Sequence, residues 1–176
     1  GIYMPEAGHT VIGLVESLGV TNWFVDINAP YQAILPAHDF LGRPFNPATE
    51  DLTRYLRPGD YIKAKIVLFD KTRNPVLSVQ GEGLGKIVSG SIIDVSPSKI
   101  PRVIGRKRSM ATMIEEKTGC TLFPAVNGRV HVECPNRELE VIVAMALKLI
   151  EAEAHTVGLT ERVAKFIEEE RARRGV

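Results

Sequence analysis

The spacing of apolar residues changes near residue 85, and this change constrains the fold more than any other feature. Between residues 8 and 80 the apolar residues form short runs rich in Val, Ile and aromatic residues, separated by Gly, Pro, Asn and Asp. Such runs are typical of β-strands. Beyond residue 85, longer stretches repeat apolar residues every three to four positions, as amphipathic helices do. We therefore predict an α+β protein with two domains of different construction.

The first half is predicted to contain five strands. They are the runs TVIGLVES, NWFVDI, YQAILPA, DYIKAKIVLF and VLSVQ. Five short strands are typical of a small barrel, and the OB-fold is the five-stranded type. The longer connection FLGRPFNPATEDLTRYLR is expected to contain a short helix at TEDLTRYL. We predict an OB-type barrel over residues 1–80.

Alternation along the second run separates a core face from an outer face. Trp23, Val25 and Ile27 share one face, which we expect to be the core. Phe24 then lies on the outer face. An outer aromatic ring can stack on a nucleobase, or it can pack against a neighbouring domain. The sequence leaves both interpretations of Phe24 open.

The fourth run has the same alternation. The even positions of 62–68 are expected to point inward, which leaves Lys63 and Lys65 on the outer face. Arg73 follows in the turn KTRNP. Cations beside an exposed ring suit single-stranded nucleic acid, because the cations attract phosphates while the ring stacks on a base. We therefore treat these cations and Phe24 as candidate RNA contacts.

The second half is predicted to follow the order β-α-α-β-β-α over residues 81–158, with a C-terminal helix over 159–176. Pro101 suits the opening of a single helical turn, and Asn136 suits the cap of the longest helix. The pair Asn127-Gly128 indicates a hairpin between two strands. The predicted elements are, in order, the strand GKIVSGSIIDVS, the turn ending VIG, the helix SMATMIEEKTG, the strands CTLFPAV and GRVHVEC, and the long helix RELEVIVAMALKLIEAEA.

The basic residues are concentrated in one turn. Residues 81–150 hold ten Lys and Arg against seven Asp and Glu, and five of the ten lie between Lys99 and Arg108. Within this stretch Arg106, Lys107 and Arg108 immediately precede a predicted helix, whose free N–H groups also favour anions. The alternative is a solvated loop without a ligand. We favour a contact with RNA phosphates, without base readout.

The remaining reactive residues predict no chemistry. The histidines are scattered, and none lies at metal-ligand spacing from a cysteine. We expect no catalytic residue, no metal and no cofactor. Cys120 and Cys134 are expected to be reduced thiols rather than a disulfide, as in a reducing compartment. No apolar run has the roughly 18 residues of a membrane helix, and no secretory leader precedes the first strand.

The second half resembles a KH module, on the segments PRVIG and MIEEKTGC with the basic turn between them. The first half resembles the OB-fold module named after ribosomal protein S-one. Together with the segments TNWFVDINAPY, DFLGR, LRPGDYI, FDKTRNP, GLGKIVSG and GLTER, the chain is similar to the Rrp-four family, the RNA-binding cap subunits of the archaeal exosome. The likeness covers nearly the whole chain.

This resemblance implies a non-catalytic cytoplasmic protein. It would guide single-stranded, often A-rich RNA to a ring of phosphorolytic 3'-5' exoribonuclease subunits that carries three cap copies. An upstream N-terminal domain is expected to be absent from this chain. Asn127 and Gly128 are similar to a structural element that packs the KH module against the barrel in this family. The expected RNA-binding residues are Phe24, Lys63, Lys65, Arg73, Arg106, Lys107 and Arg108.

The sequence also departs from the family pattern. A KH loop normally reads Gly-x-x-Gly, whereas here the loop begins at Gly105 and Arg108 occupies its fourth position. A side chain there is expected to disfavour a positive φ and to remove the backbone clamp, which leaves attraction by charge. In the barrel, Thr21 stands where a second surface aromatic is expected, and Pro36 replaces a histidine, with His38 two residues further on.

Two alternatives belong to other functional classes. A transcription elongation or antitermination factor of the NusA kind also places this barrel before KH modules. Such factors, however, carry two KH modules of the other chain order. An independent nuclease would require clustered carboxylates or a metal site, and the sequence contains neither.

Overall fold

A computed structural model describes all residues from 1 to 176 and divides them into two compact units. Residues Ile2–Val88 form the barrel unit, and residues Ser89–Val176 form the helical unit. Each unit has its own hydrophobic core. The α+β prediction with two domains is therefore confirmed.

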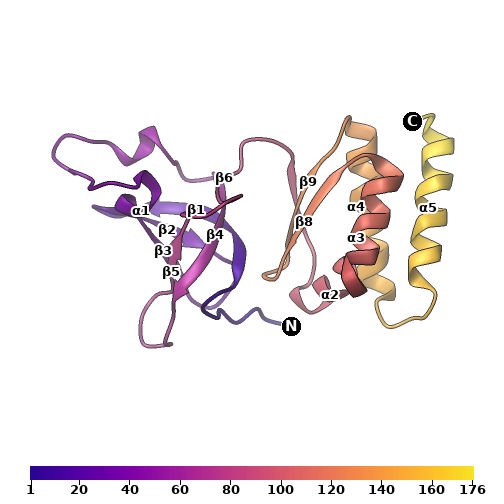
Figure 1. Ribbon diagram of the computed structural model, residues 1–176, viewed down its shortest axis with the longest axis horizontal. Coiled ribbons are helices and arrows are strands. Elements are labelled where there is room, and N and C mark those ends of the chain that lie inside the picture. Colours follow the sequence, from indigo (N-terminus) through magenta and orange to yellow (C-terminus); the bar gives the residue numbers. More distant parts are fainter. The chain divides into compact units, whose positions relative to one another are not determined.

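The barrel unit is a closed five-stranded barrel with one short additional strand. Its strands are β1 (Thr10–Leu18), β2 (Asn22–Asp26), β3 (Ala33–Pro36), β4 (Tyr61–Leu68), β5 (Val76–Ser78) and β6 (Gly85–Lys86). The order is β1-β2-β3-β5-β4-β6, and the pairing of β1 with β4 closes the barrel. Only β3 and β5 are parallel. Figure 1 shows these strands wrapped around one another.

The predicted core face of β2 is confirmed. Trp23, Val25 and Ile27 are fully buried, whereas Phe24 between them is partly exposed on the outer face. The indole N–H of Trp23 donates to the carbonyl oxygen of Leu56 at 3.0 Å. This bond satisfies the one polar atom of the largest core residue, which would otherwise be buried without a partner.

The inward prediction for β4 is confirmed for three residues and wrong for the fourth. Ile62, Ala64 and Ile66 are fully buried, but Leu68 is 48% exposed. The pairing of β4 with β5 shifts register between Ile66 and Leu68. Such a bulge places one extra residue in the strand and redirects the side chains that follow.

The connection between β3 and β4 contains two short helices. Helix α1 (Ala37–Leu41) follows β3 directly and ends at Gly42, which has a φ of 68°. The expected helix at TEDLTRYL is only the 3-10 turn η1 (Leu52–Arg54). The carboxylate of Asp51 caps this turn by accepting the Thr53 N–H at 2.9 Å. Helix α1 escaped prediction because five residues are too few to display helical periodicity.

The helical unit has the predicted β-α-α-β-β-α order with a further helix. Its elements are β7 (Ser91–Asp94), η2 (Pro97–Lys99), α2 (Ile100–Ile104), η3 (Arg106–Arg108), α3 (Ser109–Thr118), β8 (Thr121–Ala125), β9 (Arg129–Glu133), α4 (Arg137–Glu153) and α5 (Leu159–Arg174). The sheet order is β7-β9-β8. In Figure 1, α3 and α4 cover one face of this sheet and α5 packs outside them. The predicted cap of α4 is confirmed, because the Asn136 side chain accepts the Leu139 N–H at 2.9 Å.

The strand expected over GKIVSGSIIDVS is divided into two, so that single-strand prediction is wrong. Its first part, β6, pairs with β4 of the barrel, and its second part, β7, pairs with β9. Gly90 lies between them with a φ of 82°, where a Cβ would lie 2.4 Å from the carbonyl oxygen of Val132. The units therefore separate between Val88 and Ser89 rather than between residues 80 and 81.

Cys120 and Cys134 form a disulfide, which corrects the expectation of reduced thiols. The pairing of β8 with β9 places Thr121 opposite Glu133. The residues just outside this pair therefore face each other, with their Cα atoms 4.1 Å apart. The hairpin register brings the two sulfurs together, and a cysteine count alone does not indicate this geometry. None of the helices has the length and hydrophobicity that crossing a bilayer requires.

Candidate nucleic-acid interface

The outer face of the barrel presents a row of apolar side chains across three strands. Phe24 on β2 pairs with Ile34 on β3, and Ile34 pairs with Val76 on β5. Residues opposite each other in a sheet project from the same face. All three side chains are partly exposed. They form an apolar strip on which a flat ring can lie.

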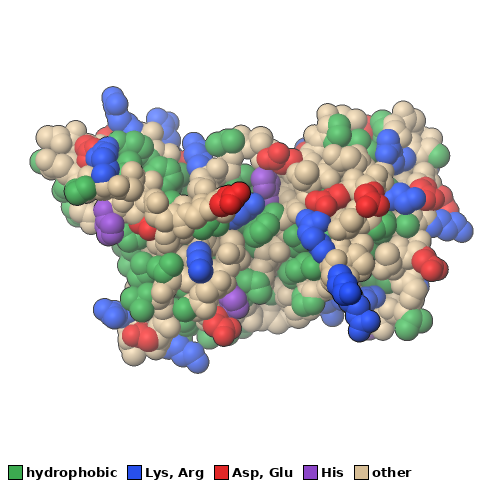
Figure 2. All heavy atoms as spheres, in the orientation of Figure 1, with side chains coloured by type: hydrophobic (Ala, Val, Ile, Leu, Met, Phe, Trp, Pro, Cys, Tyr) green, Lys and Arg blue, Asp and Glu red, His purple; other side chains and the backbone are tan.

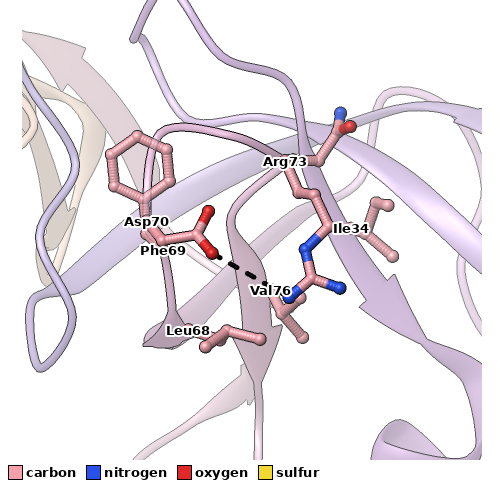
Figure 3. Close-up of a pocket in the computed structure, with 7 residues that line it drawn as sticks. Ile34, Leu68, Phe69, Asp70, Arg73 and Val76 are labelled. Carbon is pink, nitrogen blue, oxygen red and sulfur yellow. Dashed lines mark ion pairs between the residues drawn. The ribbon is translucent and has the colours of Figure 1, made fainter.

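A pocket of about 300 Å³ lies at one end of this strip. Its lining residues come from β3, from the end of β4 and from the turn and strand that follow, and they are Ile34, Leu68, Phe69, Asp70, Arg73, Asn74 and Val76. Figure 3 shows the Arg73 guanidinium beside the apolar side chains of the pocket. The Arg73 side chain is 74% exposed, and its Nη2 lies 3.9 Å from Asp70 Oδ2. We name this site the Arg73 pocket.

The turn that carries Arg73 is ordered by its own side chains. The Thr72 hydroxyl and backbone N–H donate to Asp70 Oδ1 at 2.6 and 2.9 Å. These bonds, chiefly that of the hydroxyl, hold the pKa of Asp70 below its ordinary value, and the charge of Arg73 adds a smaller effect. The Phe69 ring meets the Tyr31 ring edge-on at 4.8 Å between centroids. Arg73 is thus a cation on a defined support, suited to a phosphate beside a stacked base.

The predicted barrel lysines lie on β4, which pairs directly with β5 of the strip. Lys63 is partly buried and Lys65 is exposed, both on β4. Lys65 lies opposite Ser78, two residues along β5 from Val76, whereas Lys63 lies opposite Ile12 of β1 and Gly85 of β6. The structure therefore places Lys65 on the strand next to the strip and Lys63 further along that strand. Their contact with RNA stays a prediction.

The basic turn between α2 and α3 adopts an unusual backbone. Gly105 has a φ of 77°, and a Cβ there would lie 2.7 Å from the backbone nitrogen of Met110. Lys107 and Arg108 are both in the left-handed region, with φ values of 52° and 65°. Arg108 thus adopts the positive φ that its side chain was expected to disfavour. A non-glycine residue in this region costs about 1–2 kcal/mol unless its surroundings hold it there.

The surroundings hold Arg108 by its side chain. Its guanidinium donates to both carboxylate oxygens of Glu115, at 2.6 and 3.1 Å, and to the carbonyl oxygen of Leu122 at 2.7 Å. Glu115 in turn accepts the Leu122 N–H at 2.9 Å. The hydrogen bond from Arg108 is the main reason that the pKa of Glu115 is lowered. This latch ties the turn and α3 to strand β8.

The other two cations of the turn remain available. Arg106 and Lys107 are exposed, and their side chains form no hydrogen bond or ion pair within the chain. Figure 2 shows Lys and Arg side chains gathered over α2 and the start of α3. The structure therefore divides the predicted basic triplet into two free cations and one positioning residue, Arg108.

Asn127 and Gly128 form the tip of the β8–β9 hairpin, as predicted. Asn127 is fully buried, and Gly128 has a φ of 88°. A Cβ at Gly128 would lie 2.5 Å from the carbonyl oxygen of Val95, so only glycine fits. The backbone N–H of Val95 also donates to the Gly128 carbonyl at 2.8 Å. The pair is structural within the helical unit, and its predicted role between domains stays a prediction.

Sequence reasoning missed several members of these sites. Helical spacing does not predict the pair of Arg108 with Glu115, because Arg108 precedes α3 and has a left-handed backbone. Asp70 and Phe69 also gave no signal in the sequence, since only the folded turn brings them to the pocket. The structure contains no group of three or more His, Cys, Asp and Glu residues that could hold a metal ion.

The helical unit matches a known domain family. Residues 91–152 match the KH domain family, so the helical unit is a KH domain that follows a small β-barrel. A crystal structure of a candidate exosome complex RNA-binding protein superposes with a TM-score of 0.94 at 63% identity, covering 99% of both chains.

Two relatives that match nearly the whole chain carry the same name. The Exosome complex component Rrp4 of Aeropyrum pernix is 63% identical over 99% of this chain and 74% of its own length. The protein of the same name from Ignisphaera aggregans is 49% identical over all of this chain and 70% of its own length. This chain belongs to the Rrp4 family of exosome complex components. Neither relative is a transcription factor of the NusA kind.

Proposed function

We propose that this chain is the RNA-binding, non-catalytic part of an exosome cap subunit. It holds single-stranded RNA and directs the strand toward a phosphorolytic 3'-5' exoribonuclease ring. The observation that carries the proposal is the exposed Arg106–Lys107 pair, left free beside a latched Arg108 in a KH domain of an Rrp4 family member.

The two units contact different parts of the RNA. The KH domain holds the RNA backbone through Arg106 and Lys107 and reads no base. The barrel stacks a base on the strip that includes Phe24, while Arg73 neutralises a phosphate. Lys63 and Lys65 add charge on β4, the strand that pairs with β5. Arg108 serves RNA binding only by fixing the turn.

The proposed partners are single-stranded RNA, with a preference for A-rich sequence, and the ring subunits. Each ring carries three cap copies, which lets weak contacts add as avidity. The proposed compartment is the cytoplasm.

The test is fluorescence anisotropy with labelled A-rich single-stranded RNA and a duplex of the same length. We expect the chain to bind the single strand more tightly, because only an unpaired base can leave its neighbours and stack on the barrel. Equal affinity for both forms would contradict a stacking role for the barrel, and no binding to either would refute RNA binding by this chain.

The absence of catalysis has a separate test. The purified chain is incubated with the same labelled RNA, with and without a metal chelator and with and without inorganic phosphate. We expect intact RNA in every case. Cleavage that persists through purification and disappears with the chelator would establish a nuclease and overturn the non-catalytic assignment.

A further inference from the structure

A second hollow lies on the barrel, at the opposite end of β3 from the Arg73 pocket. Its volume is about 630 Å³, within the range of about 300–1,000 Å³ that ligand sites occupy. It is lined by Thr21, His38, Gly42, Arg43, Pro44 and Phe45. We name it the Phe45 hollow. It shares no lining residue with the Arg73 pocket or the basic turn, and Phe45 and Arg43 were not among the candidate RNA contacts.

The Phe45 hollow continues the apolar strip. Ile34, in the Arg73 pocket, pairs with Phe24, and Pro36 at the end of β3 pairs with Asn22. The chain then enters the hollow, where the Ala37 N–H donates to the carbonyl oxygen of Thr21 at 2.9 Å. Three residues of extended strand separate Ile34 from Ala37, or about 10 Å. One RNA strand lying along β2 and β3 would therefore meet both sites.

The polar groups of the hollow are Arg43, which is held in place by hydrogen bonds, and His38. Both keep hydrogen-bonding atoms without a partner in the chain. The Arg43 guanidinium donates to the Pro44 carbonyl oxygen at 3.0 Å and to the Tyr55 hydroxyl at 3.4 Å, and it pairs with Glu50 at 2.7 Å. A guanidinium has five N–H donors, so two remain for a ligand. The His38 side chain is exposed and has no hydrogen-bond partner in the chain.

The charge of the hollow favours a neutral ligand over a phosphate. Glu50 compensates the charge of Arg43, whereas the Arg73 and Arg106–Lys107 sites lack comparably close partners. The Phe45 ring is half-buried and packs against the barrel core, so it offers a supported aromatic surface. A supported ring beside free N–H donors suits a planar group that carries acceptor atoms, as a nucleobase does.

We propose that the Phe45 hollow binds one nucleobase of the RNA strand that passes the Arg73 pocket. The base stacks on Phe45, Arg43 donates to its acceptor atoms, and the His38 ring closes the rim. This inference rests on the proposed function, because it requires that the barrel binds RNA. It goes further by assigning a base-binding site whose contribution does not depend on phosphate charge.

The test uses two variants, two ligands and a salt series. Phe45→Leu keeps the apolar bulk that the barrel core requires but removes the aromatic face, and His38→Ala alters only an exposed side chain. His155→Ala is the matched control, because the His155 side chain is also exposed and unpaired but lies in the helical unit. The ligands are an oligoadenylate and an abasic ribose-phosphate strand of the same length and charge.

Loss of one stacked base weakens binding by about 5- to 150-fold. We expect Phe45→Leu to weaken oligoadenylate binding at least about fivefold, His38→Ala to weaken it less, and both to leave abasic binding and the salt slope unchanged. If Phe45→Leu binds oligoadenylate as tightly as wild type does, or if its salt slope is flatter, the base site is wrong. The proposed RNA binding by the barrel would not be affected by either result. If the wild-type chain binds neither strand, both the base site and the proposed function fail.

Discussion

Replacement of Arg108 tests whether its latch, and not an RNA contact, is its role. Arg108→Ala removes the bidentate pair with Glu115 and the bond to the Leu122 carbonyl. The Arg108 side chain is 42% exposed and that of Glu115 is 23% exposed, so solvent screens the ion pair to at most about 1 kcal/mol. The bond to the carbonyl contributes about 1 kcal/mol more. We expect the helical unit to lose about 2 kcal/mol of unfolding free energy.

Arg108→Gly separates the side chain from the backbone. Glycine removes the same hydrogen bonds but tolerates the φ of 65° without strain. We therefore expect Arg108→Gly to be more stable than Arg108→Ala by about 1 kcal/mol.

The assay is chemical unfolding followed with two probes. Far-UV circular dichroism reports mainly the long helices α3, α4 and α5, which all lie in the helical unit. Fluorescence reports the barrel, because Trp23 is the single tryptophan of the chain. We expect the helical transition to shift while the fluorescence transition stays. An unchanged helical transition in Arg108→Ala would refute the latch. Equal stability of the two variants would refute the cost assigned to the left-handed backbone at residue 108.

Three further predictions concern stability. Reduction of the Cys120–Cys134 disulfide should lower the unfolding free energy of the helical unit by about 3 kcal/mol, the value for a closed loop of about 15 residues. Unfolding midpoints measured with and without reductant test this, and equal midpoints would contradict it. Gly128→Ala should lower the unfolding free energy by at least about 2 kcal/mol, because the new Cβ meets the carbonyl oxygen of Val95. Gly83→Ala is the control: Gly83 also has a positive φ, 79°, but open space around it, so the loss should be only about 1 kcal/mol. Denaturant unfolding compares the two variants, and equal losses would contradict the clash at Gly128. The pKa of Glu115 is lower when folded, so its stabilisation is present above the unfolded value and disappears as pH falls through the folded value. Glu115→Gln should therefore flatten the loss of stability below about pH 4.5, and an acid profile identical to wild type would exclude this contribution.

The barrel and the KH order were predictable because alternation and turn residues specify them locally. The inward Trp23, Val25 and Ile27 follow from the two-residue period of a strand alone. The exposed Leu68 could not be predicted, because the bulge depends on how β4 pairs with β5. Local pattern thus identified the elements, while register between elements determined the exceptions.

The functional sites divide in the same way. The basic turn was visible as a cluster of charge, but the charges did not reveal that Arg108 is bound to Glu115. The disulfide was within reach, since Cys120 and Cys134 each lie seven residues from Asn127 at the hairpin tip. The Phe45 hollow could not be foreseen, because α1 and the loop after it bring its residues together only in the folded barrel.

The central claim is that Arg106 and Lys107 bind RNA phosphates while Arg108 does not. The most direct measurement is the salt dependence of binding to A-rich single-stranded RNA, for wild type, Arg106→Ala with Lys107→Ala, and Arg108→Gly. The log–log slope becomes shallower by about 0.7 for each phosphate that the protein no longer neutralises. We expect the double variant to flatten the slope by about 1.4 and Arg108→Gly to keep the wild-type slope. A wild-type slope in the double variant, or a flattened slope in Arg108→Gly, would contradict the claim.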